Sequence, residues 1–265
     1  MKQHYIIMSS SYTKGTRIAI DINKADQLNS EYIRNLIKEI RHACGQDVSL
    51  STHSIITESE SWDSVLQFDK FFKDVLVIND IETFINEIKR DRTLKGVDVA
   101  KYILSKLPCT HLKLEKLVYL CFADYLCETQ KRLFDDKIYA FKYGPVIDSV
   151  YEKYKSYGGE PIETLNKGDL STIKEELECS DKNSKQIEIK STLEYPQRSR
   201  ILFAEDGISK LKCIESVIKK YGSFTANQLV SITHRSGSPW TKSYTGNMYS
   251  EISEKCILKY HYNET

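Results

Sequence analysis

The stretch LKLEKLVYLCFADYL, residues 112–126, decides the fold of the second half of this chain. Apolar side chains recur in it at helical spacing, on a face wide enough for a helix buried at the centre of a domain. Thr110 is placed to cap this helix, and Pro108 stops the helix before it. The face consists of Leu114, Leu117, Val118, Cys121, Phe122 and Tyr125. We therefore expect a helical domain assembled around this segment.

The stretch AFKYGPVIDSVYEKYKSYG, residues 140–158, predicts a change from extended chain to helix. Proline suits the first position of a helix, because the N–H that it lacks has no helical partner there. We therefore expect a short strand or extended arm over residues 138–143 and a helix over residues 145–157. Tyrosines follow at three-residue steps, so some of them leave the apolar face of that helix.

The first ninety residues have a different pattern. Signals for strands and helices alternate in the order β-β-α-β-α-β-α, which is typical of a small α/β layer domain. Residues 75–78 form a continuous apolar run, which predicts a central strand buried on both faces. A polar stretch that ends at Gly96 separates this part from a mostly helical remainder. The predicted fold class is therefore α+β, with a small α/β domain over residues 1–93 and a mainly α-helical domain, with one short extended arm or strand, over residues 94–265.

Composition and charge narrow the classes of function. The 38 basic and 37 acidic residues nearly cancel, so the whole chain has no electrostatic attraction to nucleic acid or to a membrane surface. The seven cysteines never form a CxxC pair, which is typical of a reducing compartment. The longest apolar stretch, residues 118–127, contains Asp124 and cannot span a bilayer. We expect a cytoplasmic protein with no membrane partner.

Catalytic signatures are missing from the sequence. It contains no phosphate-binding loop, no GxGxxG, no HExxH and no GxSxG. The six histidines do not stand at metal-pair spacing. His111 lies two residues after Cys109, but the leucines beside it favour a structural role. We therefore expect no enzyme activity, with no catalytic residue, no metal and no cofactor.

Residues 208–240 predict two helices joined by a turn that contains glycine, as in a helix-turn-helix. Candidate contacts to phosphates and base edges are Lys219, Lys220, Asn227, Gln228 and Arg235. The surrounding charge is balanced, however, and residues 225–234 of the second helix contain no Lys or Arg. We favour a helical pair used for packing and keep DNA binding as an alternative.

Four motifs in order, VAKYILSK, LKLEKLVYLCFADYL, AFKYGPVIDSVYEKYKSYG and LVSITHRSGSPW, resemble those of the Panacea domain family of SocA-like antitoxins and the phage-associated protein GepA. The resemblance covers residues 94–265, although residues 166–199 are longer and more polar than the family pattern. The motif residues that we expect to be mainly structural are Lys113, Leu117, Tyr119, Gly144, Pro145, Val146 and His234. We expect the imidazole of His234 to form a hydrogen bond with the backbone.

The resemblance implies a bacterial or prophage antitoxin that neutralises a toxin encoded beside it by direct protein binding. It also leaves two alternatives, an adaptor that delivers the toxin to an AAA+ protease and a DNA-binding regulator of its own operon at the operator. It implies no cofactor. Large, stiff aromatic side chains with one polar end are favoured in interfaces. The candidate toxin contacts are Tyr143, Tyr151, Tyr157 and Trp240. Residues 1–93 lie outside the resemblance, and a role in partner choice is a hypothesis for them.

Overall fold

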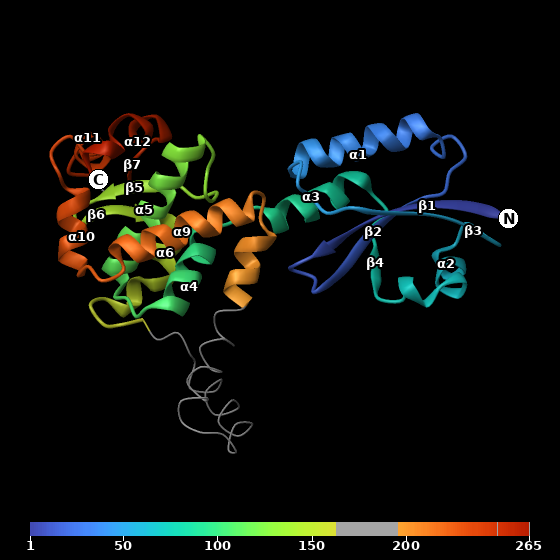
Figure 1. Cartoon of the computed structure of the whole chain (residues 1–265), viewed down its shortest axis with the longest axis horizontal. Helices are drawn as coiled ribbons and strands as arrows, with labels where there is room; N and C mark the ends of the chain where they lie inside the picture. Colours follow the sequence, from blue (N-terminus) through green and yellow to red (C-terminus); the bar gives the residue numbers. More distant parts are fainter. Residues whose placement is uncertain (163–195, 248, 265) are drawn as a thin grey trace, which may run out of the picture. The chain divides into compact units, whose positions relative to one another are not determined.

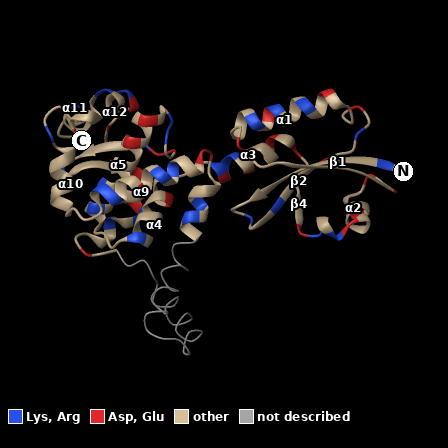
Figure 2. Cartoon of the chain, viewed as in Figure 1, with Lys and Arg blue, Asp and Glu red and all other residues tan. Residues whose placement is uncertain are grey.

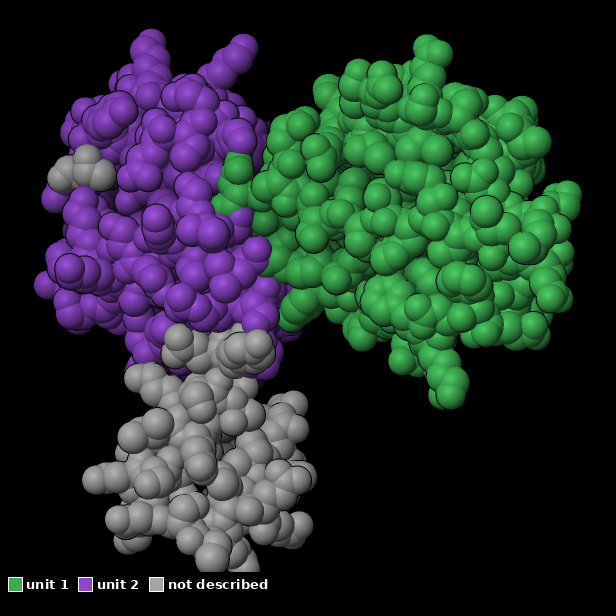
Figure 3. Space-filling view, turned by 45° about the vertical axis from the view of Figure 1, so that its right-hand side comes forward, with its two compact units in different colours: residues 1–93, 203–206 green, residues 94–202, 207–265 purple. Residues whose placement is uncertain are grey.

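The computed structural model describes residues 1–162, 196–247 and 249–264 (Figure 1). The chain divides into two compact units (Figure 3). Unit 1 comprises Met1–Thr93 together with Phe203–Asp206, and unit 2 comprises Leu94–Leu202 and Gly207–Thr265. Unit 1 contains layers of helices and a sheet, whereas unit 2 is mostly helical with a small sheet, so the predicted α+β class is confirmed. Most of the polar region at 166–199 lies outside the described residues.

A four-stranded sheet with the order β3-β1-β2-β4 forms the base of unit 1. Its strands are β1 (Lys2–Ser11), β2 (Thr16–Ile22), β3 (Ser51–Thr57) and β4 (Val75–Val77). β1 pairs antiparallel with β2 and β3, and β4 runs parallel to β2. The prediction of a central strand at residues 75–78 is wrong, because β1 already occupies the other side of β2 and leaves β4 only the outside. Leu76 of β4 is accordingly 45% exposed.

The helices of unit 1 cover both faces of this sheet. They are α1 (Ser30–Cys44), α2 (Trp62–Phe68), η1 (Lys70–Phe72) and α3 (Ile81–Arg92), in the predicted order with the strands. α1 and α3 pack on the face that bears Ile7, and α2 packs on the face that bears Ile6 (Figure 1). The segment Phe203–Asp206 joins this unit, where the Glu205 N–H donates to the carbonyl of Arg92.

Helix α5 (His111–Thr129) is the centre of unit 2, as its apolar sequence predicts. Residues 114 to 123 of this helix are all buried, and Thr110 caps its start. The other elements are α4 (Gly96–Lys106), α6 (Asp148–Tyr154), η2 (Lys155–Tyr157), α9 (Gly207–Tyr221), α10 (Ala226–Thr233), α11 (Pro239–Ser243), α12 (Glu254–Tyr260) and η3 (His261–Asn263). Five of these helices, α4, α6, α9, α10 and α12, contact α5.

A three-stranded sheet lies against α5, with the order β6-β5-β7. Its strands are β5 (Ile138–Phe141), β6 (Gly144–Ile147) and β7 (Ser250–Glu251). The predicted helix at 145–157 is wrong in its first part, because Pro145 pairs with Ala140 inside β6 and α6 begins only at Asp148. β6 is an outer strand, where a residue without an N–H is tolerated. Gly144, with a φ of 108°, ends the turn of this hairpin.

Gly144 also permits a close approach between β6 and α5. A Cβ atom at this position would lie 2.7 Å from the Lys116 Cε and 3.1 Å from the Thr233 Oγ1. We expect Gly144→Ala to lower the free energy of unfolding of unit 2 by about 2 kcal/mol more than Gly246→Ala. Gly246 is the matched control, because its φ of 86° is also positive but its Cβ would meet open space.

The measurement is urea denaturation followed by tryptophan fluorescence. The chain has two tryptophans, Trp62 in unit 1 and Trp240 in unit 2. A Trp62→Phe background therefore makes the signal specific for unit 2. Equal losses of stability for the two alanine variants would contradict the close-packing explanation.

Candidate functional site

Two charged side chains of α5, Glu115 and Lys116, are buried and hold strand β6. The Glu115 carboxylate accepts a hydrogen bond from the Ile147 N–H at 2.9 Å, and its other oxygen lies 3.2 Å from the His111 Nε2. The Lys116 ammonium donates to the Pro145 carbonyl at 2.6 Å. Burial raises the pKa of Glu115 and lowers the pKa of Lys116 to about 8, the latter against the attraction of Glu115. Both groups therefore position the hairpin on the helix.

Strand β5 displays the aromatic side chains of this hairpin. Tyr139 and Phe141 are two residues apart, so they share one face of the sheet. The ring of Tyr249, which precedes β7, lies 5.3 Å from that of Tyr139 and 5.2 Å from that of Phe141, in edge-to-face contacts. The Tyr151 ring of α6 lies 5.2 Å from Phe141 and 5.4 Å from the His111 ring. We call this connected set of Tyr139, Phe141, Tyr249, Tyr151 and His111 the aromatic face.

Two tyrosines, one in the hairpin turn and one in the aromatic face, are open to solvent. Tyr143 follows Lys142 in the hairpin turn and is 61% exposed, and Tyr249 is 55% exposed. Tyr249 has a φ of 67°, a left-handed conformation that costs a residue with a Cβ roughly 1 kcal/mol. Such strain concentrates at functional sites, where it persists because the surroundings impose it. At this position the left-handed backbone accompanies the contact of the Tyr249 ring with the rings of Tyr139 and Phe141.

Trp240 contacts the main chain at the end of β5, next to the hairpin turn. Its Nε1–H donates to the Phe141 carbonyl at 2.8 Å. Its ring stacks on His234 at 3.6 Å and on Tyr244 at 4.8 Å. The expected hydrogen bond from His234 to the backbone is absent among the described residues, where the buried Nε2 has no partner. Stacking on Trp240 therefore orients this imidazole, and burial together with the Lys116 charge lowers its pKa.

The comparisons with known proteins agree with the resemblance. Residues 114–241 match the family model for the antitoxin SocA-like Panacea domain. We call this matched region of unit 2 the Panacea domain, because it is similar to that of SocA-like antitoxins. Antitoxin SocA of Caulobacter vibrioides (strain NA1000 / CB15N) is 27% identical over 147 residues, which cover 54% of this chain and 66% of SocA. No solved structure matches this chain.

The Panacea match begins in α5 and ends in α11. It therefore contains Glu115, Lys116, the β5–β6 hairpin and Trp240. Tyr249 and His261 lie beyond its end. The aromatic face thus combines side chains of the matched region with two from outside it, His111 and Tyr249.

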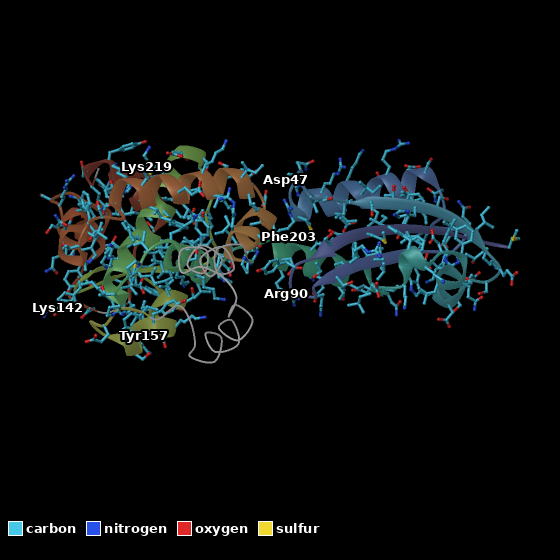
Figure 4. The ribbon with its side chains drawn as sticks, turned by 60° about the horizontal axis from the view of Figure 1, so that its bottom comes forward. Asp47, Arg90, Lys142, Tyr157, Phe203 and Lys219 are labelled. Carbon is cyan, nitrogen blue, oxygen red and sulfur yellow. The ribbon has the colours of Figure 1, made fainter. Side chains whose placement is uncertain are left out.

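The four predicted toxin contacts have different positions in the Panacea domain. Tyr143 is exposed in the turn between β5 and β6, and Tyr151 is part of the aromatic face. Trp240 is half-buried and lies behind the turn. Tyr157 lies on η2, where its ring is 6.4 Å from that of Tyr154. In Figure 4 it is near the border of unit 2 that also carries Lys142.

Sequence reasoning missed four members of the aromatic face. Tyr139 and Phe141 carry a signal, because they alternate in a stretch predicted to be extended. His111 lies at the start of α5, one residue after the cap. Tyr249 carries no comparable signal, since it is 108 residues after Phe141 in sequence and reaches it only through the short β5–β7 pairing.

The family-motif residues have structural partners. The Lys113 ammonium donates to the Gly222 carbonyl at 2.7 Å, and the Tyr119 hydroxyl donates to Glu264 at 3.0 Å. Leu117 and Val146 are buried apolar side chains. Gly144 and Pro145 shape the outer strand of the hairpin. These contacts are consistent with packing and backbone roles.

The DNA-binding candidates belong to a helical pair that packs within the Panacea domain. The Gln228 side-chain carbonyl accepts from the Thr225 N–H in the capping box of α10, and the Arg235 guanidinium donates to the main-chain carbonyl of Glu264 at 2.8 Å. Lys219 and Lys220 are exposed at the end of α9, and Asn227 is exposed on α10. Lys219 lies at the opposite border of unit 2 from Lys142 in Figure 4. Basic and acidic residues are interspersed on both units (Figure 2).

In the parts of the chain that the structure describes, no group of three or more His, Cys, Asp or Glu side chains could hold a metal ion. The cysteines within these parts, six in number, are all free. None of the helices in the described ranges is long and apolar enough to cross a bilayer.

A second buried polar cluster fastens the end of the chain to α5. The two ring nitrogens of His261 lie 2.6 Å from Asp124 Oδ1 and 2.7 Å from Glu264 Oε2. Burial alone lowers the pKa of His261, but the hydrogen bonds and charges of these two carboxylates together raise it to about 9. The ring therefore holds a proton on each nitrogen at neutral pH and donates to both carboxylates.

The His261 cluster predicts a pH-dependent stability of unit 2. Because the pKa of His261 in the folded state lies above its ordinary value of 6.5, its contribution is complete below pH 6.5 and disappears as the pH rises through about 9. Lys116 acts in the opposite sense, since its pKa of about 8 lies below the ordinary 10.5. We therefore compare the wild-type protein with His261→Gln, which retains Lys116. The difference in unfolding free energy should fall by up to about 3 kcal/mol across this range. A difference that does not change with pH would refute the charged state of His261.

Proposed function

We propose that this chain is an antitoxin that neutralises a toxin protein by binding it directly through the aromatic face. The observation that carries this proposal is the connected set of aromatic rings on the small sheet, in which Tyr249 is exposed, together with the exposed Tyr143 in the hairpin turn. The similarity of the Panacea domain to Antitoxin SocA supports an antitoxin role. The toxin would bury these rings in the interface, and the antitoxin would cover the active surface of the toxin.

The physical properties of the aromatic face are those of an interface hot spot. Tyrosines supply large apolar contact area with few rotatable bonds, so little conformational entropy is lost on binding. The hairpin below them is held by Glu115, Lys116 and Trp240, which orders the surface before a partner arrives. Such preorganisation lowers the cost of association. The Lys142 ammonium lies 5.4 Å from the Tyr143 ring centre and adds a cation beside the tyrosine.

A catalytic role of the buried charged groups Glu115 and Lys116 has less support. The two oxygens of Glu115 are engaged by the Ile147 N–H and by His111, and both Glu115 and Lys116 are enclosed by unit 2. A general base must reach a proton of its substrate, and neither group has that access. The aromatic rings are the groups that a partner can reach.

Neutralisation is tested by expressing the gene beside that of this chain in bacteria, with and without the chain. We expect the neighbouring product to stop growth alone, and the chain to restore growth. Tyr143→Ser combined with Tyr249→Ser should abolish the rescue, because it removes both exposed rings without disturbing the buried network. The control is Ile208→Ser, which changes an exposed apolar side chain of α9, a helix that contacts α5 and α4. A harmless neighbouring product, or full rescue by the double variant, would contradict the proposal.

The lifetime of the toxin separates direct masking from delivery to a protease. Masking leaves the half-life of the toxin unchanged or longer when the antitoxin is present. Delivery to an AAA+ protease shortens it. We expect the former in a pulse-chase experiment, and a half-life that shortens only in a strain with intact AAA+ proteases would establish the adaptor alternative instead.

DNA binding has weaker support than toxin binding. Gln228 and Arg235, two of its candidate contacts, are engaged in hydrogen bonds within the Panacea domain. Salt-dependent binding to the upstream promoter remains the measurement that this alternative requires.

A further inference from the structure

A groove of about 620 Å³ lies on unit 1 between α1 and the strands β1 and β3. Apolar side chains form its floor and inner wall. These are Tyr5, Leu28, Ile33 and Ile37. Ser54 of β3, which pairs with Tyr5 across the strands, extends the floor toward the edge of the sheet.

The groove exists because the helical layer stops short of the outer strand. α1 and α3 pack on this face over β1 and β2. Along β3, His53 and Ile55 point to the opposite face, where they meet the Phe72 ring and the core beneath α2. Alternation therefore places Ser54 and Ile56 on the α1 side, and Ile56 is 56% exposed there. In a layered domain, a helix normally covers an apolar sheet face such as the α1 side of β3.

A row of cations borders the groove. Arg34, Lys38 and Arg41 are spaced four and three residues apart, so they lie along one side of α1. No acidic residue lines the groove. Within residues 1–162, 196–247 and 249–264, none of the three cations forms an ion pair with a carboxylate. An apolar floor next to three uncompensated cations is complementary to a surface that is apolar and acidic.

We propose that this groove binds an acidic amphipathic helix of a partner protein. The apolar stripe of that helix covers Tyr5, Ile33 and Ile37 and completes the helical layer over β3. Carboxylates at matching four- and three-residue spacing meet Arg34, Lys38 and Arg41. The residues that line the groove lie outside the Panacea match, so this site does not depend on the proposed binding of a toxin by unit 2.

Two other occupants fit the groove less well. A single strand of nucleic acid needs aromatic platforms for its bases, and the groove offers one tyrosine among aliphatic side chains. A second copy of the chain, bound by the same groove through a two-fold axis, brings the cation rows of both copies together, and like charges repel.

The test uses the full-length protein and a fluorescein-labelled peptide of sixteen residues. This probe carries leucine at the positions of one helical stripe and glutamate on the flanking positions. We expect saturable binding, measured by fluorescence anisotropy, that weakens as the salt concentration rises. Arg34→Glu with Lys38→Glu should raise the Kd about tenfold or more, because two attractive charges become repulsive. Arg41→Glu alone should weaken binding to a smaller extent.

The matched control is Lys73→Glu with Lys89→Glu. It makes the same change in net charge at exposed positions of unit 1 that do not line the groove. It should leave the Kd unchanged, and circular dichroism should show equal folding of all variants. A scrambled peptide of the same composition should bind at least tenfold more weakly, because the apolar stripe is lost.

Several results would overturn the proposal. These are no binding of the acidic peptide, equal weakening by the two double variants, or equal binding of the scrambled peptide. Tighter binding of a sixteen-nucleotide RNA that is lost in Arg34→Glu with Lys38→Glu would assign the groove to nucleic acid. Dimerisation of the protein alone that the same variant abolishes would assign it to a second copy.

Discussion

Unit 2 depends on the burial of two opposite charges, Glu115 and Lys116, in its central helix. A buried charge is tolerated when hydrogen-bonding partners replace water. Here the partners are main-chain groups of β6, namely the Ile147 N–H and the Pro145 carbonyl. Removing either side chain leaves a backbone group of β6 unpaired in the core and takes away the attraction between the two opposite charges, which is more costly than losing one surface ion pair. The hairpin is therefore fixed on α5 by its backbone, and its outward side chains remain available for a partner.

The same helix fastens a second part of the chain in the same way. Tyr119 and Asp124 interrupt its apolar face, and both contact the cluster formed by His261 and Glu264. The polar positions of α5 thus mark the attachment points of segments that follow it in sequence, the β5–β6 hairpin and the C-terminal turn. This explains why a helix that is buried on nearly all sides retains charged residues. The scaffold that results is stiff, as a surface that binds through a few aromatic rings requires.

The two surfaces proposed for binding differ in chemistry. The aromatic face of unit 2 is built from aromatic rings, whereas the groove of unit 1 combines an aliphatic floor with three cations. The groove arises where the helical layer of unit 1 ends before β3. On these proposals the chain can contact two separate segments of one partner, or two partners.

Local patterns in the sequence determined the elements that depend on neighbouring residues. The period of apolar residues predicted α5, Thr110 predicted its start, and the alternation in unit 1 predicted its order of strands and helices. Four ordered motifs were enough to predict the Panacea family. Only the tertiary structure decided the strand role of Pro145, the outer position of β4 and the place of Tyr249 beside Phe141. For β4 and Tyr249 the deciding partner is distant in sequence, since β4 takes the side of β2 that β1 leaves open and Tyr249 follows β7. Pro145 pairs with the nearby Ala140, but its carbonyl is held by Lys116 of α5, which is 29 residues away. A local pattern contains no information about such pairing, because its free energy comes from contacts that exist only after the chain has folded.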